Sequence, residues 1–355
     1  MERFVVGTGR CGSTLLSNML AVHPDGLMIS ECLGSADRIN AFTPGSVTRE
    51  HFKELMLSNV PIIDLAVHRG NITKEQQYEV DNAVSFKIPA YLYITFPTLS
   101  DKPDQLFAEM MALAETFPTQ TRAEHYLQIF AWLQANFGKT FWIERSGSSI
   151  EYMPEMLHLF PRAKYLHIHR DGPDAALSMS NHFYFQMLVS FFTKPATREE
   201  LEQTELAGAP IRVDDPISHR LGAGRPTAEE CAAYWNYQLE MGYQAFAKLD
   251  TSQYLDVRFE DLIAEPRAVL QRIADFFEMP DSPGWMDKAS AMVSTSEVKS
   301  SMDRLSTAEQ ESLQKACQPG RILLGRYQHP WIYPTLQLIK DVTREHERRV
   351  PQAGK

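Results

Sequence analysis

A glycine-rich turn near the start of the chain carries the first residues that could do chemistry. Phe4–Gly7 predicts a short buried strand, and Ser13 opens a helix that ends near Val22, before Pro24. The turn holds three glycines, an arginine and hydroxyl residues, in the order Gly7-Thr8-Gly9-Arg10-Cys11-Gly12-Ser13-Thr14. Backbone N–H groups at such a helix N-terminus bind anions, and the helix dipole strengthens the binding. The segment therefore predicts a phosphate-binding turn.

Three kinds of phosphate-binding turn compete for this segment. A Walker A loop needs a lysine after its last glycine, and none follows Gly12. A Rossmann fingerprint is satisfied by the three glycines, and Glu31 stands 19 residues after Gly12, where a ribose-binding acid is expected. The third interpretation is a phosphate-binding loop of another kind. It rests on Arg10, a cation at a place where a Rossmann turn usually has a small or apolar residue.

A second strand, loop and helix could bind another anion. Lys164–His169 predicts a strand, Arg170 follows it, and Pro173 suits the first turn of a helix that carries Ser178. Ligands of open α/β sheets bind at the carboxyl ends of the strands. Arg170 and Ser178 could therefore hold one phosphate, although an arginine paired with a neighbouring aspartate is the structural alternative. Two such sites favour a nucleoside with phosphates at both ends.

Together these segments resemble those of sulfotransferases that use 3′-phosphoadenosine 5′-phosphosulfate (PAPS). Arg10-Cys11-Gly12-Ser13-Thr14-Leu15 is similar to their 5′-phosphosulfate loop, and Arg170 followed by Ser178 eight residues later is similar to their 3′-phosphate motif. Two more stretches match the bacterial and tyrosylprotein-type branch, namely Leu20-Ala21-Val22-His23-Pro24-Asp25 and Asp256-Val257-Arg258-Phe259-Glu260-Asp261-Leu262. The resemblance runs in order from residue 4 to about residue 280.

The resemblance implies in-line transfer of a sulfuryl group to an acceptor hydroxyl, with release of 3′,5′-ADP and without a metal. Arg10 would stabilise the leaving phosphate, and Glu31 would be the general base rather than a surface glutamate. Arg145 stands where the family has the lysine of its E-K-T-P stretch, so it would assist transfer or bind phosphate. The residues expected to bind the donor are Thr8, Gly9, Arg10, Cys11, Gly12, Ser13, Thr14, Leu15, Arg170 and Ser178. Cys11 replaces the usual serine, so we expect only its backbone to take part.

Two other functions remain open from the residues alone. A Rossmann-type NAD(P)-dependent oxidoreductase would use the three glycines and Glu31. A non-catalytic nucleotide-binding protein would keep the 3′,5′-ADP site without transfer. We expect the acceptor to be a small-molecule or carrier-bound hydroxyl. The sequence indicates neither which hydroxyl compound it is nor the oligomeric state of the protein.

The elements that must position these residues alternate between short apolar strands and longer amphipathic helices. This pattern predicts an α/β, P-loop-like fold of three layers, with a mainly parallel sheet between helices. The expected strands are Phe4–Gly7, Leu27–Ser30, Ala83–Lys87, Thr140–Glu144, Lys164–His169 and Tyr254–Phe259. The expected helices include Ser13–Val22, Pro103–Phe117, Arg122–Phe137, Ile150–Phe160, Asp174–Phe192 and those opened by Thr227 and by Pro266. We expect one domain over residues 1–345, with an irregular insert at 193–226 as a possible acceptor lid, and a solvated tail at 346–355.

Composition excludes several classes of protein. Lys and Arg number 35 against 45 Asp and Glu, a net charge of −10 that argues against general nucleic-acid binding. The four cysteines form no CxxC pair, so neither a disulfide framework nor zinc is expected. His167 and His169 share one strand face, but no acidic partner for a metal is evident in the sequence. No apolar run approaches about 20 residues and no signal peptide precedes the first strand, which predicts a cytoplasmic protein without a membrane span.

Overall fold

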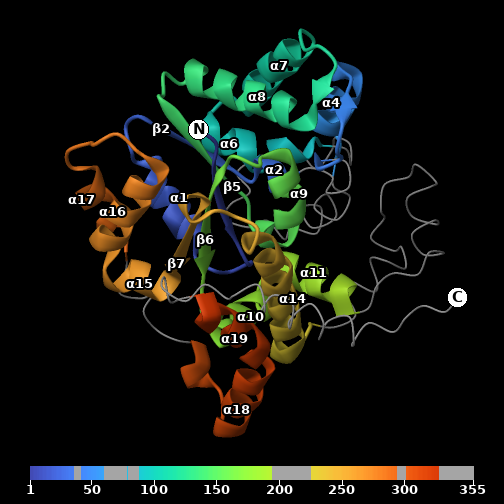
Figure 1. The fold of residues 1–355 in the computed structure, drawn as a ribbon. Helices are drawn as coiled ribbons and strands as arrows, with labels where there is room; N and C mark the ends of the chain where they lie inside the picture. The colour runs from blue at the N-terminus through green and yellow to red at the C-terminus, as the bar shows by residue number, and fades with distance from the viewer. Residues whose placement is uncertain (36–40, 60–77, 79–87, 194–224, 294–300, 328–355) are drawn as a thin grey trace, which may run out of the picture.

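The computed structural model describes residues 1–35, 41–59, 78, 88–193, 225–293 and 301–327 (Figure 1). A five-stranded sheet forms its centre, in the order β2-β5-β1-β6-β7. Its strands are β1 (Arg3–Gly7), β2 (Gly26–Ser30), β5 (Phe141–Arg145), β6 (Lys164–His169) and β7 (Tyr254–Arg258). Every neighbouring pair is parallel, so all five carboxyl ends lie at one edge. The expected α/β fold with a parallel sheet between helices is confirmed.

Strand order excludes one of the sequence interpretations. In a Rossmann fold the second strand of the chain lies beside the first. Here β5 separates β2 from β1, and the residue after β2 is therefore not next to the loop after β1. The Rossmann dinucleotide interpretation of the three glycines and Glu31 is wrong.

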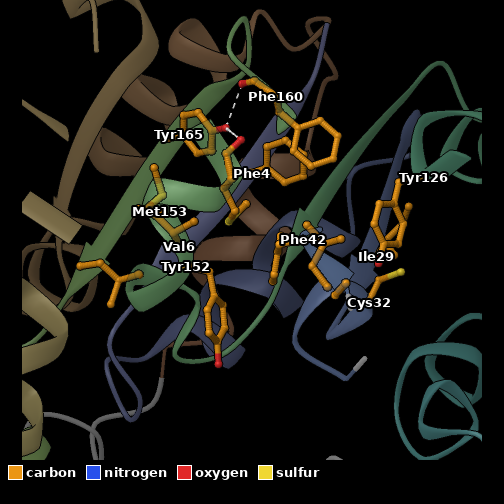
Figure 2. Close-up of a cluster of buried hydrophobic side chains, with 14 of the residues drawn as sticks. Phe4, Val6, Ile29, Cys32, Phe42, Tyr126, Tyr152, Met153, Phe160 and Tyr165 are labelled. Carbon is orange, nitrogen blue, oxygen red and sulfur yellow. Dashed lines mark hydrogen bonds between the residues drawn. The ribbon is translucent and has the colours of Figure 1, made fainter. Parts of the chain in front are cut away.

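The sheet is buried on both faces, as the full burial of β1 and β5 shows. Alternate residues of β1 point to opposite faces, so Phe4 and Val6 belong to one apolar cluster and Val5 to the other. On the first face, Phe4 packs against Phe160 and Tyr165, with ring centroids 4.8 and 5.6 Å away (Figure 2). The Tyr165 hydroxyl donates to the carbonyl oxygens of Met156 and Phe160 at 3.0 and 2.9 Å.

Helices cover both faces (Figure 1). The cluster around Val5 is covered by α1 (Ser13–Ala21), α15 (Phe259–Ala264), α16 (Pro266–Phe277) and α17 (Trp285–Ser290). The cluster around Phe4 is covered chiefly by α8 (Arg122–Asn136), α9 (Met153–Leu159) and α14 (Ala228–Phe246). The remaining elements are α2 (Cys32–Ser35), β3 (Ser46–Val47), α4 (Arg49–Leu57), η1 (Ala90–Leu92), α6 (Thr95–Leu99), α7 (Pro103–Ala114), β4 (Gln120–Thr121), η2 (Ser149–Tyr152), α10 (Gly172–Ser180), α11 (Phe183–Thr193), η3 (Thr251–Gln253), η5 (Ser301–Arg304), α18 (Thr307–Ala316) and α19 (Gln318–Tyr327).

Capping residues and prolines in the sequence predicted helix starts that the structure confirms. Thr227 and Glu230 form the expected capping box at the start of α14, and Pro266 is the first residue of α16. The single helix expected over Asp174–Phe192 is wrong, because α10 ends at Ser180 and α11 begins at Phe183. The Asn181 side chain donates to the Leu177 carbonyl oxygen at 2.8 Å and ends the first helix.

Some expected segments lie outside the described residues. These are the strand Ala83–Lys87, the insert apart from residues 193, 225 and 226, and the tail at 346–355. In the part of the chain that the structure describes, no helix combines the length and apolar character needed to cross a membrane.

Candidate active site

The sequence-predicted site residues lie along the carboxyl edge of the sheet. Glu31 follows β2, Arg145 ends β5, residues 8–12 follow β1 and Arg170 follows β6. Since β2, β5, β1 and β6 are consecutive in the sheet, the four positions follow one another along this edge in that order. Neighbouring strands are spaced about 4.8 Å apart. One extended ligand could therefore touch several of these positions.

The loop over residues 8–12 is built to approach an anion. Arg10 and Gly12 have left-handed backbones, with φ of 60° and 87°. Gly12 precedes α1 without a side-chain cap, and the first turn of α1 carries no acidic residue. The positive end of the helix dipole is thus not neutralised by the protein itself, which favours an anionic ligand there.

The glycines of the loop also have packing roles that sequence reasoning did not find. A Cβ on Gly9 would lie 1.9 Å from the Phe185 ring of α11. A Cβ on Gly12 would lie 2.0 Å from the Phe259 ring of α15. These helices therefore pack directly on the loop and fix its shape. Their contacts could be predicted only with the tertiary structure known.

Thr8 and Cys11 are turned away from solvent. Cys11 is fully buried in the cluster around Val5, and burial raises the pKa of its thiol. Only the backbone of Cys11 is then left for a ligand, in agreement with the sequence expectation. The Thr8 hydroxyl is also buried and has no hydrogen-bond partner among the described residues.

The two predicted anion sites adjoin each other. Arg10 donates a hydrogen bond from Nε to Oγ of Ser178 at 3.0 Å. This contact follows from the sheet, because β1 and β6 pair in parallel and their loops leave the same edge side by side. The residues that the sequence assigned to separate phosphates thus meet in one place.

Arg170 remains available to an anion. Its guanidinium lies over the Phe259 ring, 5.3 Å from the centroid, and its closest carboxylate oxygen is Oδ1 of Asp174 at 3.9 Å. That separation exceeds a hydrogen bond, and the guanidinium forms none elsewhere in the described residues. Asp171 is engaged instead by Arg321, whose Nε lies 2.8 Å from Oδ1. The structural alternative is thus present as a long ion pair with Asp174, which leaves the hydrogen-bond donors of the guanidinium for a ligand.

Glu31 and Arg145 form an ion pair at the other end of the edge. The Glu31 backbone is left-handed, with φ of 58°, and its N–H donates to the Arg145 carbonyl oxygen at 2.7 Å. Its Oε1 pairs with Nη1 of Arg145, and its Oε2 accepts the Gly147 N–H at 2.9 Å. The Glu31 side chain is 18% exposed and that of Arg145 only 5%. The carboxylate is thus held in place but reachable.

Backbone strain occurs at Arg10 and Glu31 and at two other positions. Among the described residues other than glycine, positive φ occurs at Arg10, Glu31, Ser148 and Glu278. A left-handed backbone at a non-glycine residue costs about 1–3 kcal/mol and tends to cluster at functional sites. Two of these four residues, Arg10 and Glu31, are ones for which the family resemblance implies a catalytic role.

A buried carboxylate was missed by sequence reasoning. Glu144 precedes Arg145 on β5 and is 1% exposed. Burial raises its pKa to about 7, although hydrogen bonds from Ser146 and Leu33 act to lower it. The available signal was an acid within an otherwise apolar strand, Phe141-Trp142-Ile143-Glu144.

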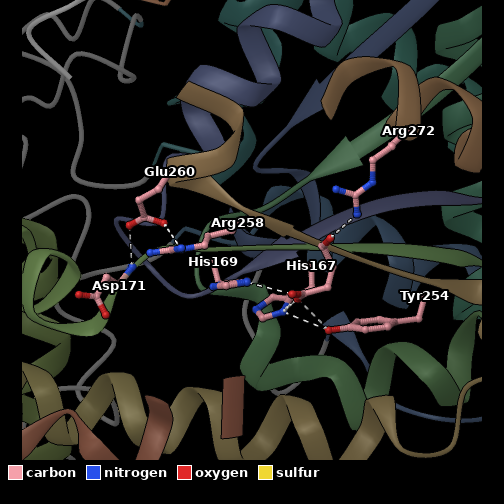
Figure 3. Close-up of polar contacts among 8 residues, drawn as sticks. His167, His169, Asp171, Tyr254, Arg258, Glu260 and Arg272 are labelled. Atoms are coloured by element: carbon pink, nitrogen blue, oxygen red, sulfur yellow. Dashed lines mark hydrogen bonds and ion pairs between the residues drawn. The ribbon is translucent and has the colours of Figure 1, made fainter. Parts of the chain in front are cut away.

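The strand histidines form a structural network (Figure 3). Asp256 of β7 accepts from Nδ1 of His167 and Nε2 of His169, both at 2.9 Å. Burial alone would raise the pKa of Asp256, but the two imidazoles outweigh burial and hold it below its usual range. The sequence did not reveal this carboxylate, because it comes from another strand. No group of three acidic, Cys or His side chains in the described residues is arranged to hold a metal.

Comparisons with known proteins place the chain in a family. A sequence profile described as the sulfotransferase family matches residues 3–212 and 218–283. The search of curated proteins finds no match. Similar solved structures include the sulfotransferase domain from the Synechococcus PCC 7002 olefin synthase, 16% identical with a TM-score of 0.44 over 93% of this chain and 95% of that one. The sulfotransferase domain from the curacin biosynthetic pathway is 13% identical, with a TM-score of 0.41 over 99% of each chain. Sulfotransferase STF9 from Mycobacterium avium is 15% identical, with a TM-score of 0.44 over 92% of this chain and 75% of that one.

Proposed function

Because the chain belongs to the sulfotransferase family, we propose that it transfers a sulfuryl group from PAPS to an acceptor hydroxyl and releases 3′,5′-ADP. The observation that carries the proposal is the 3.0 Å contact between Arg10 Nε and Ser178 Oγ. It joins the loop after β1 to the helix after β6, so one nucleotide with two anionic ends can engage both.

The charges of the site suit such a donor. The 5′-phosphosulfate end would bind at the uncapped start of α1 and at Arg10. The 3′-phosphate would accept hydrogen bonds from the Arg170 guanidinium and the Ser178 hydroxyl. Negative charge develops on the leaving phosphate as the sulfur–oxygen bond breaks. Arg10 would stabilise that charge, and the proposal assigns no role to a metal.

Glu31 is the proposed general base. It lies two strands from the β1 loop, about 10 Å at ordinary strand spacing, a distance that a transferring group and an acceptor oxygen could span. Glu31 would take the hydroxyl proton as the new oxygen–sulfur bond forms. The Arg145 guanidinium would act as a fixed positive charge beside the transferring group.

Transfer is tested with PAPS carrying a labelled sulfuryl group. The protein is incubated with phenol, sugar, lipid and peptide hydroxyl acceptors in parallel, and with water alone, and both labelled product and 3′,5′-ADP are measured. Equal amounts of labelled product and 3′,5′-ADP support transfer. Tight binding of 3′,5′-ADP without any release of label would instead support the non-catalytic nucleotide-binding alternative.

A further inference from the structure

The segment that carries Glu31 is held by the end of the neighbouring strand. β2 and β5 pair in parallel, with Ile29 opposite Glu144 and Ser30 opposite Arg145. Immediately after this pairing ends, the chain turns through the left-handed Glu31 into the short helix α2. A four-residue helix has too few internal hydrogen bonds to hold itself, so its position must come from outside.

Glu144 and Ser146 supply that support from β5 and the residues after it. Oε1 of Glu144 accepts the Leu33 N–H at 3.1 Å and the Ser146 hydroxyl at 2.6 Å. The Ser146 oxygen in turn accepts the Gly34 N–H at 2.8 Å. Two side chains thus bind the N–H groups of Leu33 and Gly34, the second and third after Glu31, and are bonded to each other.

The same residues leave the Glu31 carboxylate little freedom. A Cβ on Gly34 would lie 3.2 Å from Oε2 of Glu31 and 3.0 Å from Cβ of Ser146. A Cβ on Gly147 would lie 3.3 Å from Oε1 of Glu31. The carboxylate therefore fits between two glycines that flank it, and a shift of α2 would move it relative to Arg145.

We propose that Glu144, acting through Ser146 and the start of α2, is a positioning residue that fixes the Glu31 carboxylate for proton transfer. The inference rests on the proposed function. Glu144 is itself 1% exposed, so it cannot touch an acceptor, and its effect must pass through Glu31. What the network needs from Glu144 is a hydrogen-bond acceptor at Oε1, which the amide oxygen of glutamine can also provide.

Four variants separate positioning from other roles. Glu144→Ala removes the acceptor and Glu144→Gln keeps it, while Ser146→Ala removes only the linking hydroxyl. Ser149→Ala is the matched control, because Ser149 is also 1% exposed but donates to the Ser146 carbonyl oxygen and bonds neither α2 nor Glu31. For each variant we would measure kcat for release of sulfate from PAPS, the Kd of 3′,5′-ADP, and amide hydrogen exchange at Leu33 and Gly34.

Positioning predicts a specific pattern. Glu144→Ala and Ser146→Ala should lower kcat about 10- to 100-fold, the loss expected from a small misplacement of a reacting group, and should leave the Kd of 3′,5′-ADP within about twofold. Both should speed exchange at Leu33 or Gly34. Glu144→Gln should keep most of kcat and the slow exchange, and Ser149→Ala should match the wild type.

Three results would overturn the proposal. They are wild-type kcat in Glu144→Ala or Ser146→Ala, equal loss of kcat in Glu144→Gln and Glu144→Ala, and a loss of 3′,5′-ADP affinity parallel to the loss of kcat. If the wild type neither bound 3′,5′-ADP nor released sulfate, the proposed function would fail. Exchange at Leu33 and Gly34 would still decide whether Glu144 holds the segment.

Discussion

Arg10 and Ser178, 168 residues apart in sequence, are joined by a hydrogen bond of 3.0 Å between Nε and Oγ. One residue belongs to the turn after the central strand and the other to the second turn of the helix after the neighbouring strand. Their contact turns two separate strand-end loops into one surface with two cations, Arg10 and Arg170. The proposed donor, a nucleotide with anions at both ends, would engage this surface with both ends.

Replacing Arg170 should remove recognition of the 3′-phosphate. A charge-assisted hydrogen bond contributes about 1.5–3 kcal/mol, so Arg170→Ala should reduce the preference for 3′,5′-ADP over 5′-AMP by about 10- to 100-fold. Isothermal titration of both nucleotides measures this preference. Arg267→Ala is the control, because Arg267 of α16 is exposed and pairs with Asp287 of α17, away from the proposed site. An unchanged preference in Arg170→Ala would remove Arg170 from the donor site.

Glu31 should be needed for transfer but not for donor binding. General base catalysis contributes about 10²- to 10⁴-fold, so Glu31→Gln should lower kcat by about that factor and leave the Kd of 3′,5′-ADP nearly unchanged. Glu50→Gln is the matched control, because Glu50 also pairs with an arginine, Arg49, but on the surface. Parallel losses of kcat and nucleotide affinity would show that Glu31 binds the donor rather than the proton.

The loop glycines should be intolerant of side chains. Gly9→Ala would drive a methyl group into the Phe185 ring, and Gly12→Ala would combine a clash with Phe259 with an unfavourable φ of 87°. Each should lower Tm and weaken 3′,5′-ADP binding together, since the loop that packs against these rings is also the proposed anion-binding loop. Gly325→Ala is the control, because its Cβ would meet no atom within 4 Å and alanine favours helix. Normal binding by Gly9→Ala would mean that the loop adapts.

Glu144 should make stability depend on pH. Its folded-state pKa of about 7 lies above the ordinary value of 4.5, so the folded state binds more protons between these pH values. Stability from this group is therefore present below about pH 4.5 and is lost as pH rises to about 7, by about 3 kcal/mol in total. Glu144→Gln removes this dependence.

Chemical denaturation of wild type and Glu144→Gln at pH 5 and pH 8 measures this pH dependence of the free energy of unfolding. The variant should gain free energy of unfolding relative to the wild type on going from pH 5 to pH 8. Taking the difference between the two proteins cancels opposing contributions, such as that of buried His167, whose pKa burial lowers. A difference that is the same at both pH values would contradict the raised pKa.

Features with a local cause could be predicted from the sequence. The apolar run of β1, its glycine turn and the serine that opens α1 adjoin in the chain, so their pattern specifies a strand, loop and helix directly. Arg170 and Ser178 are equally local, eight residues apart on one loop and helix. The capping box of Thr227 and Glu230 likewise needs no tertiary information.

Features that depend on distant segments could not be predicted. Asp256 meets His167 and His169 only because β7 pairs with β6, across 87 to 89 residues of sequence. The ion pair of Glu31 with Arg145 spans 114 residues and needs β2 beside β5, an order that no local pattern gives. The role of Glu144 is of the same kind, because its partners belong to the segment after another strand.

The proposed site for a donor with two anionic ends is tested most directly by thermal unfolding of the wild type with 3′,5′-ADP, 5′-AMP or NAD. A ligand at a hundredfold excess over its Kd stabilises the folded state by about 2.7 kcal/mol, which a shift in Tm reports. We predict a clear rise in Tm with 3′,5′-ADP and little with 5′-AMP or NAD. Equal shifts with 3′,5′-ADP and 5′-AMP, or no shift with 3′,5′-ADP, would contradict a site that binds both ends of the nucleotide.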